Sequence, residues 1–101
     1  MGVDLDLALK DCDAALHRSP DNSDYLDSRA FVRLRRGDLD GAMKDYKAAL
    51  KLQPRLASAR YGLGVVETRK GMTSDGERDV QAALAEKPDA ADRFKRAGLT
   101  Q

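Results

Sequence analysis

The sequence offers few side chains that could act as catalysts or metal ligands. It contains one histidine, His17, and one cysteine, Cys12, among 101 residues. Nucleophilic catalysis needs a base within hydrogen-bond reach of a serine or cysteine, and His17 lies in no recognised arrangement of that kind. A zinc site needs several Cys or His ligands. We therefore expect no enzymatic activity, no cofactor and no bound metal.

Two pairs of carboxylates and one arginine cluster are the other chemically suggestive features. Asp4 with Asp6, and Asp38 with Asp40, stand where helices are expected to begin, so capping explains them. The cluster consists of Arg33, Arg35 and Arg36 and could bind RNA or phosphate. Because no aromatic platform or Gly-rich loop accompanies it, a solvated face near a helix C-terminus is the favoured interpretation.

Composition and charge exclude several functional classes. Lys and Arg number 18 and Asp and Glu 17, so a net charge of +1 gives no general attraction to nucleic acid or an anionic membrane. No run of about 18 apolar residues could span a bilayer. The acidic amino terminus lacks a signal-peptide core. A single cysteine is typical of a reducing compartment. We expect a cytoplasmic protein without a membrane partner.

The elements that position these residues are helices, and the clearest helical signal lies in residues 23–54. Its second half carries one apolar stripe at spacings of three and four residues: Leu39, Ala42, Met43, Tyr46, Ala49 and Leu50. Gly37 and Asp38 separate this stripe from a preceding helical run, because glycine can end a helix and aspartate can cap the next. Pro54 ends the second helix, so the segment is a helical hairpin.

The hairpin recurs along the chain with a period of 34 residues. The three prolines, Pro20, Pro54 and Pro88, stand at this interval. The same interval relates three further sets of residues: Ala15, Ala49 and Ala83; Leu16, Leu50 and Leu84; Gly37 and Gly71. A 34-residue period with two helices per unit predicts an all-α fold, an α-solenoid of antiparallel helix pairs.

The central hairpin resembles the tetratricopeptide repeat (TPR) family. That family has a small residue opening the second helix, an aromatic four positions on, an alanine three further, and a closing proline, and Ala42, Tyr46, Ala49 and Pro54 match all four. The resemblance covers nearly the whole chain and implies one TPR-like domain with about two full repeats. The expected boundaries are 1–101 for the domain, 4–18 for a preceding half-repeat helix, 23–54 and 57–88 for the full repeats, and 90–98 for a C-terminal capping helix.

The two ends of the array depart from a complete repeat. The helix at 4–18 matches a second helix whose first helix is missing, which indicates either a fragment of a longer array or a flank that meets another surface. The helix at 90–98 has Phe94 as its apolar anchor and is expected to cover the last apolar face of the array. Its register also matches the start of another first helix, which leaves a longer parent chain open.

Arg29 and two glycines depart from the commonest TPR pattern. A branch of the family pairs an arginine at this point with an aspartate before the aromatic of a second helix, so the resemblance implies that Arg29 bridges to Asp45 or Asp11. Gly62 and Gly64 each cost about 1 kcal/mol in a helix interior. We expect a close backbone approach at Gly64, whereas Gly62 falls where the concave surface is expected.

The resemblance implies a protein–protein interaction module. In this family the first helices of the repeats line a concave groove that binds extended peptides or helices of partner proteins. Transferring these positions by register gives the expected groove residues: Asp24, Asp27, Ser28, Phe31, Arg35, Ser58, Tyr61, Val65, Arg69, Asp92, Lys95 and Arg96. Asp27 and Phe31 stand where a chaperone-binding subgroup needs Lys and Asn, so that subgroup is not expected. The aromatic and apolar positions suit a short peptide with one or two hydrophobic anchors.

Two alternatives remain open for the function. The first is self-assembly, in which a two-fold homodimer hides the uncovered flank of Leu5, Leu9 and Leu16. The second is binding of RNA or phosphate through the arginine cluster, which would show a steep dependence on salt.

Overall fold

The computed structural model describes residues 4–99. The helices in this range are α1 (Leu5–Arg18), α2 (Ser23–Arg35), α3 (Leu39–Leu52), α4 (Ala57–Arg69), α5 (Thr73–Glu86) and α6 (Asp92–Arg96). The described part of the chain contains no helix that is both long enough and apolar enough to cross a bilayer.

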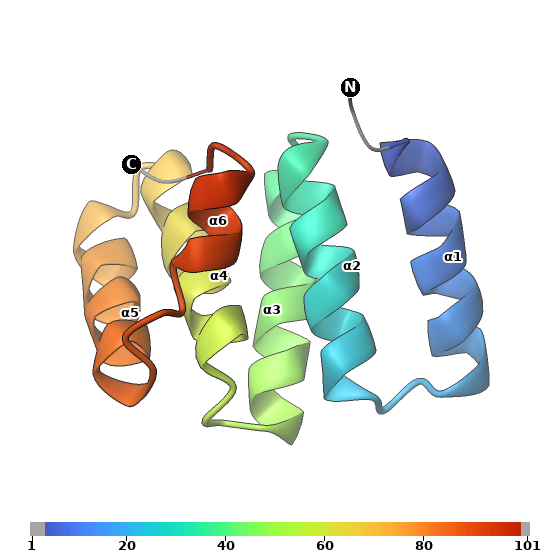
Figure 1. Cartoon of the computed structure of the whole chain (residues 1–101), viewed down its shortest axis with the longest axis horizontal. Helices are drawn as coiled ribbons and strands as arrows, with labels where there is room; N and C mark the ends of the chain where they lie inside the picture. The colour runs from blue at the N-terminus through green and yellow to red at the C-terminus, as the bar shows by residue number, and fades with distance from the viewer. Residues whose placement is uncertain (1–3, 100–101) are drawn as a thin grey trace.

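The helices repeat with the period seen in the sequence. α2 with α3 and α4 with α5 form two antiparallel pairs, and α1 stands beside α2 (Figure 1). α1, α3 and α5 begin at Leu5, Leu39 and Thr73, and α2 and α4 begin at Ser23 and Ala57, so equivalent helices start 34 residues apart. The predicted all-α solenoid of helix pairs is confirmed.

The turn within each pair is fixed by a glycine in the left-handed conformation. Gly37 between α2 and α3 has φ +85°, and Gly71 between α4 and α5 has φ +88°. Asp38 then caps α3, because its carboxylate accepts a hydrogen bond from the Gly41 N–H at 2.9 Å. Asn22 caps α2 in the same way, through the Tyr25 N–H. These local signals fix the turn within each pair and the starts of α2 and α3, and α2 and α4 are the first helices of the two pairs.

The core between the pairs is built from small and aliphatic side chains around the ring of Tyr46. Gly64 of α4 meets α5 closely, since an added Cβ would lie 2.8 Å from the Gly76 carbonyl oxygen, and the expected close approach is confirmed. The expectation for Gly62 is wrong. This residue is buried and faces the Tyr46 ring of α3, which leaves no room for a side chain there.

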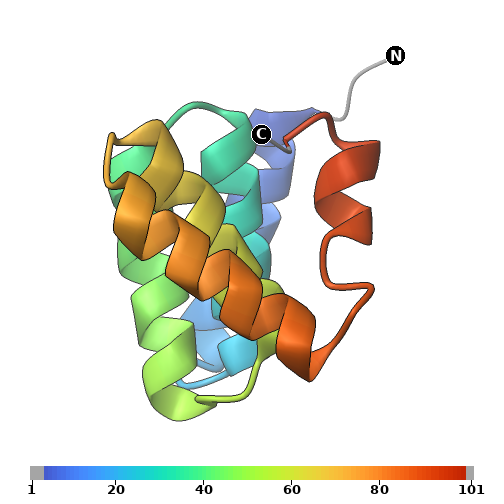
Figure 2. The same ribbon diagram turned by 90° about the vertical axis from the view of Figure 1, so that its left-hand side faces the viewer.

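The C-terminal helix is present, but it does not lie where a further first helix would stack. α6 lies across the face formed by α2 and α4, in front of α4 in Figure 1, and stands apart from α5 in the turned view of Figure 2. The capping helix therefore covers an apolar face, but that face is the one formed by α2 and α4. The physical reason is Phe94, whose ring finds aromatic partners on α2 and α4.

Candidate functional site

The face formed by α2 and α4 holds an aromatic slot that is filled by α6. The ring of Phe94 is fully buried. Its centroid lies 5.3 Å from that of Phe31 on α2, with the planes at 88°, and 4.9 Å from that of Tyr61 on α4. Edge-to-face and tilted contacts at these distances are favourable for aromatic pairs. Phe94 thus joins the two first helices across the concave side.

One buried carboxylate lies beside this slot. Asp27 of α2 is 6% exposed. Its Oδ2 accepts a hydrogen bond from the Ser58 hydroxyl of α4 at 2.8 Å, and Arg93 Nη2 of α6 lies 3.3 Å from Oδ1 and 3.4 Å from Oδ2. Burial raises the pKa of Asp27 above its usual range, although the charge of Arg93 acts in the opposite direction. The site therefore combines a partly compensated negative charge with aromatic walls.

The guanidinium of Arg93 contacts both parts of the site. It lies 4.2 Å from the centroid of the Phe31 ring, within the range of a cation–π interaction, while it reaches Asp27. Its Nε is buried and has no hydrogen-bond partner among the described residues. Arg93 is thus held by stacking and by one long ion pair, without full hydrogen bonding.

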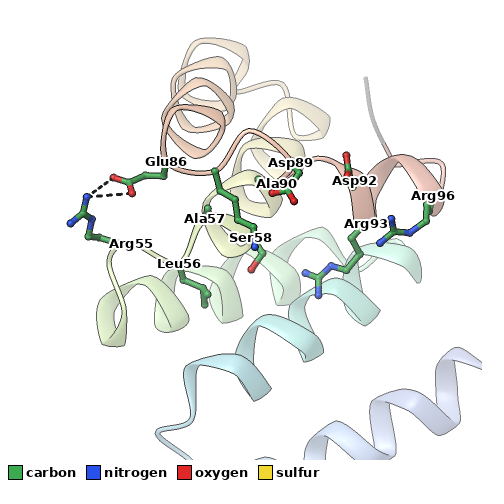
Figure 3. Close-up of a pocket in the computed structure, with 11 residues that line it drawn as sticks. Arg55, Leu56, Ala57, Ser58, Glu86, Asp89, Ala90, Asp92, Arg93 and Arg96 are labelled. Atoms are coloured by element: carbon green, nitrogen blue, oxygen red, sulfur yellow. Dashed lines mark hydrogen bonds and ion pairs between the residues drawn. The ribbon is translucent and has the colours of Figure 1, made fainter.

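A hollow of about 600 Å³ continues from this site toward the start of α4 and the end of α5 (Figure 3). Ser58 and Arg93 belong to both the site and the hollow. At the far rim, Arg55 and Glu86 form an ion pair at 3.1 Å. Both signs of charge line the hollow, together with Leu56, Ala57 and Ala90. The hollow therefore lies next to the segment of the face that α6 covers.

The structure brings together only part of the predicted groove. Asp27, Phe31, Ser58 and Tyr61 contact α6 or one another, and buried Val65 belongs to the same apolar cluster as Phe94. Six further predicted residues are exposed, and one is half-buried with its guanidinium 5.7 Å from the Phe31 ring. The exposed ones are Asp24, Ser28, Arg69, Asp92, Lys95 and Arg96, and the half-buried one is Arg35.

The groove positions expected on the C-terminal helix lie outside the contact that this helix makes with α2 and α4, although Asp92 and Arg96 line the neighbouring hollow. Asp92, Lys95 and Arg96 are exposed, whereas Arg93 and Phe94 meet the concave face. The transfer by register assumed that this helix continues the row of first helices, and α6 instead folds back onto that row. The apolar side chain of Phe94 was the one feature of the sequence that indicated the contact of α6 with α2 and α4.

The arginine cluster is not a single basic surface in the structure. Arg33 donates to Asp45 at 2.9 Å, and Arg36 pairs with Asp6 of α1 at 2.8 Å. Arg35 lies near the Phe31 ring. Two of the three arginines therefore hold helices together through ion pairs.

The predicted bridge from Arg29 is confirmed for one of its two proposed partners. Arg29 donates two hydrogen bonds to Asp45, from Nε at 2.8 Å and from Nη2 at 2.9 Å. These bonds raise the pKa of Arg29 above its ordinary value. The proposal for Asp11 is wrong, because the third contact, at 2.9 Å, is with Asp13 of α1. The network ties α1, α2 and α3 together.

The remaining features concern α1 and metal binding. Leu16 is buried, Leu5 and Leu9 are half-buried, and Leu7 is 55% exposed, so the predicted uncovered flank is only partly open. Residues 4–99 contain no group of three or more His, Cys, Asp or Glu side chains that could hold a metal ion.

The geometry defines a helical-repeat protein whose first helices, α2 and α4, form a face against which α6 packs. The TPR repeat family model matches residues 32–71, which cover the end of α2, all of α3 and α4, and the turn after α4. Together with the 34-residue spacing of the helix pairs, this match supports the predicted resemblance to TPR-repeat proteins. A comparison with curated proteins found no match.

Proposed function

We propose that the chain is a protein–protein interaction module that binds a short segment of a partner protein on the concave face of α2 and α4. One observation supports this proposal above the others: that face holds a short helix, α6, by an aromatic anchor and a buried carboxylate. TPR repeats generally mediate protein–protein interactions and are typically non-catalytic scaffolds.

The energetics of the face suit recognition of a short segment. Interfaces derive most of their affinity from a few aromatic or arginine anchors placed in desolvated pockets. Phe31 and Tyr61 form such a pocket, and Asp27 supplies a charge that fixes the orientation of a ligand. A carboxylate that is left buried without a cation is costly, so ligands lacking a cation are disfavoured.

The test is selection of peptides from a displayed random library on the full chain, followed by chemical-shift mapping of the selected peptides. We expect the largest shifts on the inner faces of α2 and α4. Phe31→Ala should weaken binding at least about tenfold, because it removes one wall of the aromatic slot. Lys47→Ala changes an exposed residue of α3 and serves as the matched control, which should bind as the wild type does.

Two results would count against the proposed function. One is a set of selected peptides whose shifts map to the outer helices α3 and α5. The other is selection that yields no binder while thermal melting shows the immobilised chain to be folded.

A further inference from the structure

The concave site has a chemistry that specifies its ligand. The slot between Phe31 and Tyr61 takes a flat ring, and Asp27 beside it is buried with one hydrogen bond from Ser58. A guanidinium suits the neighbouring position because its planar group can stack on an aromatic ring and hydrogen-bond a carboxylate at once. Lysine lacks that planar group, so the site favours arginine.

The spacing of the two ligand groups follows from α6. Arg93 and Phe94 are consecutive, and on a helix consecutive side chains point about 100° apart. Phe94 enters the slot while the Arg93 guanidinium lies over the Phe31 ring and reaches Asp27. An arginine followed directly by an aromatic residue, on one turn of helix, therefore reaches both parts of the site.

α6 does not make all the hydrogen bonds that this site could make with a ligand. Its Arg93–Asp27 contacts of 3.3 and 3.4 Å are longer than the 2.8 and 2.9 Å of Arg29 with Asp45, and Arg93 Nε is buried without a partner among residues 4–99. α6 has only five residues and no side-chain hydrogen bond at its N-terminus. Helices this short are unstable alone, so its helical form depends on docking.

We propose that the concave site is selective for a short helical segment of a partner protein in which an arginine directly precedes an aromatic residue, and that α6 occupies this site in cis until such a segment displaces it. This inference rests on the proposed function of the same face and names the ligand. A resident segment lowers the apparent affinity for a partner in proportion to the fraction of time that the site is empty.

The probe is a fluorescent peptide with the sequence of residues 88–99, PDAADRFKRAGL, titrated by anisotropy against the full chain. We expect it to bind Phe94→Ala at least about tenfold more tightly than the wild type, whose site is occupied. Lys95→Ala, at an exposed position of α6, is the matched control and should bind as weakly as the wild type. Arg93→Glu is a second variant in which α6 should leave the site, because the new carboxylate repels Asp27. This variant removes no apolar side chain from the site.

Altered probes test the two anchors. Against the opened variants, peptides with Arg93→Glu or Phe94→Ala should lose binding by at least about tenfold, and a peptide with Arg93→Lys should fall between them and the parent probe. Equal binding of all four peptides would overturn the proposal. Equal binding of the parent probe to the wild type and to both opened variants would overturn it as well.

Two further outcomes separate this inference from the proposed function. Library-selected peptides that map to α2 and α4 but lack an arginine–aromatic pair would overturn the inference and leave the proposed function standing. Light scattering provides the other outcome: a concentration-dependent wild-type dimer that is lost in Phe94→Ala would overturn the inference in favour of a second copy inserting its own α6.

Discussion

At the scale of single residues, the most constrained charge in the described chain is Asp45. Its side chain is 3% exposed and accepts hydrogen bonds from both Arg29 and Arg33. Asp13, which accepts from the remaining nitrogen of Arg29, is 52% exposed. A buried carboxylate with two guanidinium partners is costly to disturb, because removing its charge leaves two partly desolvated cations without their buried partner.

The asymmetry between these two aspartates gives the first prediction. Asp45→Asn should lower the free energy of unfolding by about 3 kcal/mol, since the new amide N–H groups face the N–H groups of the guanidinium. Asp13→Asn should cost less than about 1 kcal/mol, as expected for an exposed pair. Urea unfolding of the two variants and the wild type measures both. If both variants lose the same free energy of unfolding, burial does not determine how much each ion pair stabilises the protein.

The same network shows what could be predicted at this scale. The pairing of Arg29 with Asp45 was predictable, because the sequence carries both residues at the positions where one branch of the family places them. The choice of Asp13 over Asp11 was not. These two residues point to different sides of α1, and the rotation of α1 about its own axis decides which one meets the guanidinium. That rotation is set by the packing of the whole α1–α2 interface, and no local sequence pattern predicts it.

At the scale of elements, the α4–α5 pair is built on a close crossing. Added Cβ atoms would lie 2.8 Å from the Gly76 carbonyl oxygen at Gly64 and 2.7 Å from the Gly64 carbonyl oxygen at Gly76. The sequence predicted the approach at Gly64, since a glycine in a helix interior needs compensation. It did not predict that Gly62 faces Tyr46. The rotation of α4 about its own axis decides whether Gly62 points toward α3 or toward the surface, and the repeat pattern does not fix that rotation.

This close crossing also buries a carboxyl group. Glu67 of α4 is 6% exposed. The pKa of Glu67 is raised to about 8. Burial is the largest cause, and the hydrogen bond with Asp79 and the negative charge of Asp79 are the next largest. Asp75 of α5 raises the pKa further, and Lys47 of α3 lowers it. At neutral pH the folded chain therefore keeps a proton on the Glu67–Asp79 pair that the unfolded chain releases.

The second prediction is a loss of stability as pH rises. The ordinary pKa of a glutamate is about 4.3, so between about 4.3 and 8 the folded state binds more protons than the unfolded state. The contribution of Glu67 should be present below this window and should decline by up to about 1.4 kcal/mol per pH unit within it. Glu67→Gln should remove this decline, measured by urea unfolding from pH 5 to 8.

The comparison isolates the coupled Glu67–Asp79 pair from other groups. Asp27 also has a raised pKa, but it is present in both proteins, so it cancels in the difference between the wild type and Glu67→Gln. Glu77→Gln, at an exposed position of α5, is the matched control and should follow the wild-type curve. Parallel curves for Glu67→Gln and the wild type would mean that Glu67 is ionised in the folded chain.

At the scale of the whole molecule, the helix pairs follow the repeat, whereas α6 departs from it. Stacked repeats contact mainly their neighbours, so each pair is predictable from its own sequence and that of the next. The position of α6 depends instead on Asp27 and Phe31, more than 60 residues away in sequence. Its register is that of another first helix, and only a search over all faces of the array could choose between stacking and folding back.

This arrangement leads to the last prediction, which concerns how α6 opens. Its hydrogen bonds include those donated by Lys95 and Leu99, and its hold on the array comes from Arg93 and Phe94. Short peripheral elements can open without global unfolding. The amides of α6 should therefore exchange with an opening free energy at least about 2 kcal/mol below that of Val65, with little dependence on denaturant.

A pair of variants distinguishes local opening of α6 from global unfolding. Phe94→Ala should abolish protection throughout α6 because the helix loses its main apolar contact, while the amides of α3 and α4 keep their slow exchange. Lys95→Ala, at an exposed position, should change neither. If the amides of α6 and α4 instead share one opening free energy and one denaturant slope, α6 belongs to the global folding unit. A helix that opens only with the whole protein could not yield the groove to a partner, so this exchange measurement also bears on how the concave face becomes available.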